Sequence, residues 1–179
     1  EFCEKYPGGT ELVISLLFVD VRGSTSLAEG ISPAAFSRLM NRFYQQATDV
    51  LIRTDAFIDK LVGDEVMALY LPLFTGPDHA GAAIRAAQGL LNVSTGSGRQ
   101  IELPIGIGVH TGLAYVGTVS GAEGTVTDVT ALGDNVNIAA RLASTAGPGE
   151  ALISEDALRE AGVEFLDTEE PHLMLKGKS

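Results

Sequence analysis

The pattern of apolar and polar residues predicts alternating strands and helices along the chain. Residues 11–21 are mostly apolar and contain neither Gly nor Pro, which indicates a buried strand. From Ser32 to about Thr54, apolar residues recur every three or four positions, as in a helix with one buried face. Ser32 followed by Pro33 is typical of a helix start. The residues expected on the buried face are Phe36, Leu39, Met40, Phe43, Ala47, Val50 and Leu51.

The middle of the chain predicts a β-hairpin followed by a second helix. Residues 57–62 and 66–71 have the composition of two short strands. Gly63-Asp64 between them is typical of a tight turn, so the hairpin carries a carboxylate at its tip. The Ala- and Leu-rich stretch 80–93 predicts the second helix.

With a strand that begins at residue 105 and continues toward 116, these elements follow the order β-α-β-β-α-β of a ferredoxin-like split fold. We therefore expect an α+β domain with a ferredoxin-like βαββαβ core and extra C-terminal strands and helices. Residues 1–10 are expected to be a linker, and residues 11–179 a single domain. The further expected elements are a Gly/Ser-rich loop at 117–124, strands at 126–132 and 151–154, helices at 135–145 and 155–161, and a last strand ending at Lys176.

Charge and composition narrow the range of partners. The net charge of −11 argues against a nucleic-acid groove, which needs basic patches. The chain can still bind a phosphate ligand if metal ions supply the positive charge. No apolar run approaches the roughly 20 residues of a transmembrane helix. The single Cys allows no internal disulfide, as expected in a reducing cytoplasm. Because the sequence starts at Glu1 rather than Met, we expect a longer protein with a regulatory domain outside these residues.

Two carboxylates are the first candidates for a metal site. Asp20 ends the first predicted strand, and Asp64 lies at the tip of the hairpin. In the split fold these strands are neighbours in the sheet, so the two carboxylates can meet, and Mg²⁺ or Mn²⁺ would relieve their repulsion. Two such ions about 4 Å apart can clamp a phosphoryl group. Taken alone, Asp20 also fits a turn cap, and Asp64 an ordinary hairpin tip.

Further polar residues suit a nucleotide. The backbone amides of residues 23–25 can face an anion. Asn137 and Arg141 share one helix face, and an amide above a guanidinium suits a ribose oxygen and the charge of a pentavalent phosphorus. Lys60 and Thr130 could read the edge of a purine base. Taken alone, the first pair also fits a solvated helix face, and the second pair consists of ordinary strand residues.

In combination, these stretches resemble the catalytic domain of class III nucleotidyl cyclases, the adenylate and guanylate cyclases. They occur in the order and spacing of that family, and the resemblance covers about residues 12–178. The matching stretches are Phe18-Val19-Asp20-Val21-Arg22-Gly23-Ser24-Thr25, then Lys60-Leu61-Val62-Gly63-Asp64, then Gly133-Asp134-Asn135-Val136-Asn137 and on to Arg141.

The resemblance implies a nucleotide cyclase fold and roles for individual residues. Asp20 and Asp64, with the carbonyl of Val21, would bind two divalent metal ions, Mg²⁺ or Mn²⁺. Lys60 matches the lysine that selects adenine, and Thr130 occupies the partner position. A Lys/Thr pair is similar to the bacterial IIIb branch, so ATP is the expected substrate.

The same resemblance assigns the triphosphate contacts and the reaction. The implied activity is that of an adenylate cyclase, which converts ATP into 3′,5′-cyclic AMP and pyrophosphate. The residues assigned to the transition state are Asn137 and Arg141, and those assigned to the phosphates are Gly23, Ser24, Thr25 and Lys176.

The family places each active site between two subunits arranged head to tail. One copy would supply the Asp pair, and the other would supply Lys60, Thr130, Asn137 and Arg141, so a homodimer is expected. Two alternatives stay open: a guanylate cyclase, which Lys60 disfavours, and a non-catalytic module that binds nucleotide or only dimerises. A diguanylate cyclase is disfavoured because only part of its signature is present. Some IIIb members respond to bicarbonate, which is a further hypothesis about regulation.

Overall fold

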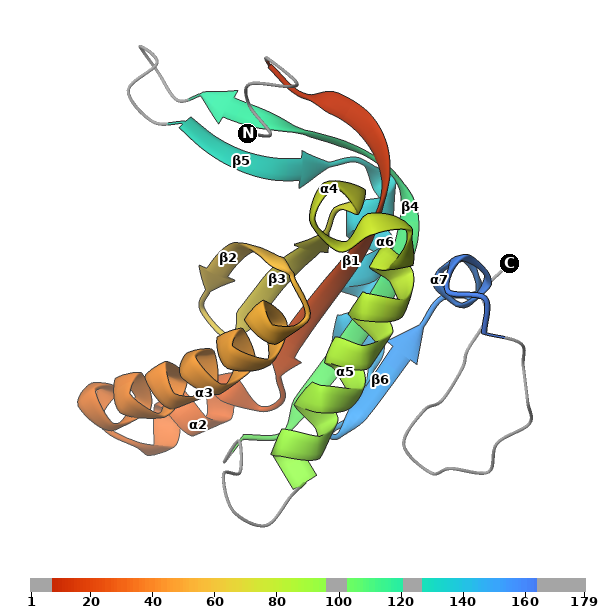
Figure 1. Ribbon diagram of the computed structural model, residues 1–179. Coiled ribbons are helices and arrows are strands. Elements are labelled where there is room, and N and C mark those ends of the chain that lie inside the picture. The colour runs from red at the N-terminus through yellow and green to blue at the C-terminus, as the bar shows by residue number, and fades with distance from the viewer. Residues whose placement is uncertain (1–7, 96–102, 121–126, 164–179) are drawn as a thin grey trace.

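The computed structural model describes residues 8–95, 103–120 and 127–163 (Figure 1). A six-stranded sheet runs in the order β2-β3-β1-β4-β5, and β6 pairs with β4. Strand β1 (Thr10–Val21) lies in the middle, antiparallel to β3 (Glu65–Tyr70) and to β4 (Ile105–Ser120). The other strands are β2 (Phe57–Val62), β5 (Thr127–Leu132) and β6 (Glu150–Ile153), of which β6 is parallel to β4.

Two hydrophobic clusters, one on each face of the sheet, explain why β1 is apolar along most of its length. Leu17 and Val19 pack with helices α3 (Pro33–Arg53) and α5 (His79–Thr95) on one face. Leu16 and Phe18 pack on the other face, where α6 (Asp134–Thr145) covers the sheet. Successive side chains of a strand point to opposite faces, so a strand buried on both sides needs apolar residues at almost every position.

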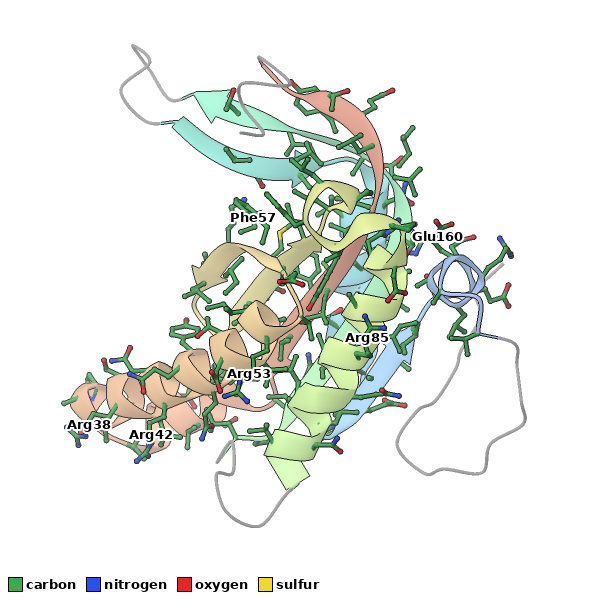
Figure 2. All side chains as sticks on the ribbon, in the orientation of Figure 1. Arg38, Arg42, Arg53, Phe57, Arg85 and Glu160 are labelled. Carbon is green, nitrogen blue, oxygen red and sulfur yellow. The ribbon has the colours of Figure 1, made fainter. Side chains whose placement is uncertain are left out.

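Helix α3 has the start and the buried face that the sequence predicts. The Ser32 hydroxyl accepts a hydrogen bond from the Ala35 N–H at 3.3 Å, and Pro33 occupies the first turn. All seven residues expected on the buried face are buried in the core or packed against it. Arg38 and Arg42 lie on the exposed face, directed away from the sheet (Figure 2).

Helix α6 approaches the sheet closely because β4 lacks side chains beneath it. A Cβ atom on Gly108 would collide with backbone atoms of Ala139 and Ala143. Burial of Ala139 and Ala143 against β1 and β4 completes this interface. The small residues therefore fix where α6, which carries Asn137 and Arg141, lies on the sheet.

The predicted α+β fold with its βαββαβ core is confirmed, and most predicted boundaries differ from the observed ones by one or two residues. The remaining helical elements are α2 (Ser24–Gly30), α4 (Pro72–Thr75), the 3₁₀ helix η1 (Gly76–Asp78) and α7 (Glu155–Glu160). The sequence analysis predicted none of α2, α4 and η1. Helix α2 escapes notice because it has seven residues and its N-cap, Gly23, offers no capping side chain.

The predicted loop at 117–124 is wrong in its first part, because residues 117–120 extend strand β4 and pair with β5. This pairing outweighs the low strand propensity of Gly117. A side chain at Gly117 would also collide with the backbone of Gly8 and Gly9, which lies close to this strand. Residues 121–126, most of the predicted linker (1–7) and the last predicted strand lie outside the described residues. Within the described part of the chain, no helix is both long and apolar enough to span a membrane.

Candidate functional site

Asp20 and Asp64 meet where the end of β1 passes the tip of the β2–β3 hairpin. The Val21 N–H donates to the Asp64 carbonyl at 3.0 Å, and Asp20 is the register partner of Glu65. Gly63, in the hairpin turn, has a φ of +63°, a conformation that favours glycine. The structure thus brings together the two carboxylates that the sequence placed at a strand end and a hairpin tip.

The carboxylates at this edge disfavour one another's charge. Burial raises the pKa of the Asp20 carboxyl, the neighbouring Arg22 guanidinium partly offsets this, and the Asp64 charge raises the pKa further. Burial likewise raises the pKa of Glu65, with additional contributions from Asp20 and Asp64. A cation at this edge would relieve these effects.

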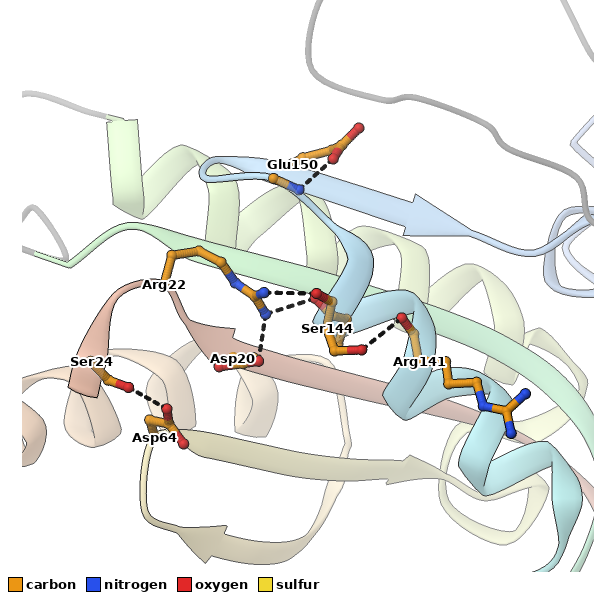
Figure 3. A network of polar contacts seen from close by, with 9 residues as sticks. Asp20, Arg22, Ser24, Asp64, Arg141, Ser144 and Glu150 are labelled. Carbon is orange, nitrogen blue, oxygen red and sulfur yellow. Dashed lines mark hydrogen bonds and ion pairs between the residues drawn. The ribbon is translucent and has the colours of Figure 1, made fainter. Parts of the chain in front are cut away.

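Arg22 connects Asp20 to helix α6 (Figure 3). Its Nη2 atom forms an ion pair with Asp20 Oδ2 at 2.5 Å and also donates to the Ala143 carbonyl at 2.8 Å. Its Nη1 atom donates to the Ser144 carbonyl at 2.9 Å. Both carbonyls belong to the last turn of α6, where a cation satisfies free acceptors and interacts favourably with the helix dipole. The sequence analysis gave Arg22 no role.

Hydroxyl groups hold the hairpin tip against the start of α2 and against α3. The Ser24 hydroxyl donates to Asp64 Oδ2, and the Tyr44 hydroxyl donates to the Gly63 carbonyl at 2.5 Å. The hydroxyl of Ser24 is therefore engaged by Asp64, while Gly23 and Thr25 are exposed. These contacts position the carboxylate that the sequence analysis assigned to metal binding.

The donor set at this edge fits Mg²⁺ or Mn²⁺ held jointly with a phosphate. Among the described residues, no group of three or more His, Cys, Asp or Glu side chains is arranged to hold a metal ion. Mg²⁺ is commonly bound through one or two carboxylates together with substrate phosphates rather than by an all-protein cage. Asp20 and Asp64 provide this smaller set of oxygen donors.

A second polar cluster joins β2 to β5, although these strands lie at opposite ends of the strand order. The Lys60 ammonium donates to Thr130 Oγ1 at 2.9 Å. Thr130 in turn donates to Asp59 Oδ2 at 2.7 Å, and Lys60 Nζ lies 3.4 Å from the same oxygen. The structure brings the two predicted base-recognition residues into contact and adds Asp59, which the sequence analysis missed.

Asn137 and Arg141 are both exposed on α6. In Figure 3 the Arg141 guanidinium points away from Asp20 and Asp64. The start of α6 is fixed by Asn135, whose side chain hydrogen-bonds His110 Nε2 at 2.8 Å and donates to the Leu113 carbonyl at 2.7 Å. Within one chain, Arg141 therefore does not meet the carboxylate pair. Lys176 lies outside the described residues.

Several proteins that are similar to this chain are named as nucleotidyl cyclases. The family model of the adenylate and guanylate cyclase catalytic domain matches residues 10–179. The chain is 33% identical to an adenylate cyclase of Anabaena cylindrica over 134 residues. The matched region covers 72% of this chain and 26% of that protein. The crystal structure of the guanylyl cyclase Cya2 matches with a TM-score of 0.77 and 30% identity, over 87% of this chain and 81% of that one. The adenylyl cyclase CyaB from P. aeruginosa matches with a TM-score of 0.75 and 28% identity, over 86% of this chain and 82% of that one.

Proposed function

The chain belongs to the adenylate and guanylate cyclase catalytic domain family, and we propose that it converts ATP into 3′,5′-cyclic AMP and pyrophosphate. The observation that carries the choice of ATP is the contact between Lys60 and Thr130, 2.9 Å from Nζ to Oγ1. An ammonium donor suits the acceptor N1 of adenine, whereas the N1 of guanine carries a hydrogen. The matched proteins are named as adenylyl cyclases in some cases and as guanylyl cyclases in others, so the choice of ATP rests on this chain's own residues.

Asp20, Asp64 and the carbonyl of Val21 are the proposed ligands of two divalent ions, Mg²⁺ or Mn²⁺. When bound, the ions would lower the pKa of the ribose 3′-hydroxyl and neutralise charge on the triphosphate. The protein's part is to hold the two carboxylates together: Ser24 donates to Asp64, and Arg22 contacts Asp20. Burial and the Asp64 charge raise the pKa of Asp20 despite the opposing charge of Arg22, so a further cation would favour the ionised carboxylate.

Asn137 and Arg141 are proposed to act on a nucleotide bound at the carboxylates of a second copy. Asn137 would orient the ribose, and Arg141 would stabilise the charge that develops at the α-phosphorus. Their exposure, and the direction of Arg141 away from Asp20 of its own chain, support a head-to-tail homodimer with two shared sites. Each site would then take its metal ligands from one copy and its base and transition-state residues from the other.

The triphosphate is assigned to backbone amides at the start of α2 and to one lysine. Ser24 and Thr25 begin that helix, so their N–H groups have no acceptor within it. Gly23 precedes them with a φ of +70°. Lys176 would reach the terminal phosphates by the family resemblance. We further propose that the domain works in the cytoplasm, within a longer protein that carries its regulatory domain; the chain spans 26% of the Anabaena relative.

The test is cyclic-nucleotide formation from ATP and from GTP, with Mg²⁺ or Mn²⁺, across a dilution series of the protein. We expect cyclic AMP in excess of cyclic GMP, with specific activity that falls as the dimer dissociates. Cyclic GMP as the main product would make the chain a guanylate cyclase. Nucleotide binding by a verified dimer without any cyclic product would replace the proposal with a non-catalytic module.

A further inference from the structure

We propose that Asp59 fixes the direction of the Thr130 hydrogen bonds and thereby makes the site select adenine over guanine. This inference rests on the proposed function and adds a positioning residue to it. Asp59 does not itself face the base: its side chain is 0% exposed. It acts through Thr130, whose hydroxyl it contacts at 2.7 Å.

An irregularity in strand β2 brings Asp59 to this position. The pairing register with β3 passes from Ile58–Ala68 directly to Lys60–Met67, so Asp59 is the extra residue of a β-bulge. In a regular strand, neighbouring side chains point to opposite faces of the sheet. A bulge redirects side chains locally and is frequent beside active sites. Asp59 and Lys60, although adjacent in sequence, therefore both contact Thr130.

The contacts determine what the Thr130 hydroxyl can still do. A hydroxyl has one proton to donate and two lone pairs that accept. Thr130 donates its proton to Oδ2 of Asp59 and accepts from Lys60. An ionised carboxylate only accepts, so it cannot take the opposite role. While Asp59 holds that proton, the hydroxyl can offer a ligand only an acceptor.

A donor at Lys60 and an acceptor at Thr130 complement the edge of adenine but not that of guanine. Adenine carries an amino group at its six position, which donates, whereas guanine carries a carbonyl there, which accepts. Thr130 as an acceptor pairs with the amino group, while Lys60, with three donor hydrogens, donates to N1. With guanine bound, the six-position carbonyl would face the Thr130 lone pair, so two acceptors would meet. The N1–H of guanine would face the Lys60 ammonium, so two donors would meet. Selection then arises from repulsion of the wrong base as well as attraction of the right one.

Burial separates the tasks of the three residues. The side chain of Lys60 is 44% exposed, whereas Thr130 is 4% exposed and the side chain of Asp59 is 0% exposed. In the proposal, the exposed Lys60 side chain turns toward the base and leaves the Thr130 hydroxyl able to accept a hydrogen bond from it. Within the described residues, Asp59 Oδ1 has no hydrogen-bond partner, and Oδ2 accepts from Lys60 and Thr130.

The test compares kcat/KM for ATP, GTP and ITP in the wild type and in Asp59→Asn. ITP shares the six-position carbonyl of GTP but lacks its two-amino group, so it isolates the edge that faces Thr130. An amide at position 59 can donate to Thr130, which frees the hydroxyl proton for a carbonyl. We expect the ATP-to-GTP and ATP-to-ITP ratios to fall by about tenfold or more. Asp59→Ala should shift both ratios in the same direction.

Two controls separate hydrogen-bond direction from a general loss of structure. Asp49→Asn makes the same chemical change at an exposed residue of α3 that pairs with Arg53, and should leave the ratios unchanged. In a Thr130→Val background, Asp59→Asn should no longer alter the ratios, because no hydroxyl remains to be oriented. Thermal unfolding of each variant reports whether the fold is kept.

The outcomes distinguish this inference from the proposed function. A wild type that forms no cyclic nucleotide from any of the three substrates contradicts the proposed function. A wild type that prefers ATP, with the same ratios in a folded Asp59→Asn or Asp59→Ala, overturns the role of Asp59 alone. An equal effect of Asp59→Asn with and without the Thr130 hydroxyl would overturn it too. If neither variant folds, the carboxylate serves the fold rather than selection, and the inference is likewise overturned.

Discussion

Nη2 of Arg22 lies 2.5 Å from Oδ2 of Asp20, and the same guanidinium donates to two carbonyls in the last turn of α6. One side chain therefore joins a proposed metal ligand to the helix that carries the proposed transition-state residues. Because Arg22 presents a planar set of donors, it can serve all three acceptors at once, which a single ammonium cannot do with the same geometry.

Replacing Arg22 tests whether this connection matters for catalysis. Arg22→Lys keeps the charge but cannot reproduce the three contacts, so we expect kcat/KM for ATP to fall by about tenfold or more through misplacement of Asp20. Arg53→Lys, at an exposed arginine of α3, is the matched control and should retain wild-type activity. Wild-type kcat/KM in a folded Arg22→Lys would mean that Asp20 needs no such support.

Loss of either carboxylate should abolish activity without loss of the fold. Asp20→Ala and Asp64→Ala each remove a proposed metal ligand, and at Asp20 the substitution also removes a charge that burial disfavours. We expect no cyclic AMP above background with Mg²⁺ or Mn²⁺, together with a cooperative thermal unfolding transition. Activity retained by Asp20→Ala would exclude the two-metal assignment.

The packing of α6 on β4 predicts a position that does not tolerate a methyl group. In Gly108→Ala the new Cβ would meet backbone atoms of Ala139 and Ala143, so helix and strand must separate. We expect the free energy of unfolding to fall by about 1–3 kcal/mol in denaturant titrations. Gly30→Ala, where a Cβ would meet nothing within 4 Å, is the control and should change stability little. Equal stability of the two variants would contradict the close packing.

The burial of His79 predicts how the stability of the fold depends on pH. It is 3% exposed, and burial lowers its pKa, although Glu160 on α7 and Asp78 in η1 act in the opposite direction. The unfolded chain therefore binds this proton more readily than the folded one, and stability should fall as the pH drops below the ordinary histidine pKa of about 6.5.

His79→Gln isolates that contribution. We expect a weaker decline of the free energy of unfolding between pH 7.5 and pH 5.5, approximately the interval around the ordinary histidine pKa, than in the wild type. The variant should also be less stable at the upper end, because Ser15 Oγ lies 2.9 Å from His79 Nδ1 in the core. An unchanged slope would assign the acid sensitivity to other groups.

Much of the fold was predictable because its signals are local. The apolar run of β1 and the Ser32-Pro33 start of α3 are visible in a few adjacent residues, and both predictions are confirmed. Helix α2 was missed because its N-cap is a glycine. The end of β4 was missed because its strand structure depends on pairing with a distant segment.

The same distinction between local and distant signals applies to the candidate site. Asp20 and Asp64 are marked by a strand end and a turn, so their meeting follows from the predicted topology. The role of Arg22 depends on Ala143 and Ser144, more than a hundred residues away in sequence. Asp59 depends on a bulge, and the alternation of residues in β2 gives no sign of it. The proposed roles themselves stay predictions.

The most direct test of a cyclase with shared sites is complementation between two inactive variants. Asp20→Ala and Arg141→Ala are each expected to be inactive as homodimers. In a mixed dimer, one of the two sites would combine Asp20 of one chain with Arg141 of the other, both intact. We expect cyclic AMP to appear when the two variants are mixed and allowed to exchange subunits. No product from a verified mixed dimer, with the wild type active, would contradict a site built from two copies.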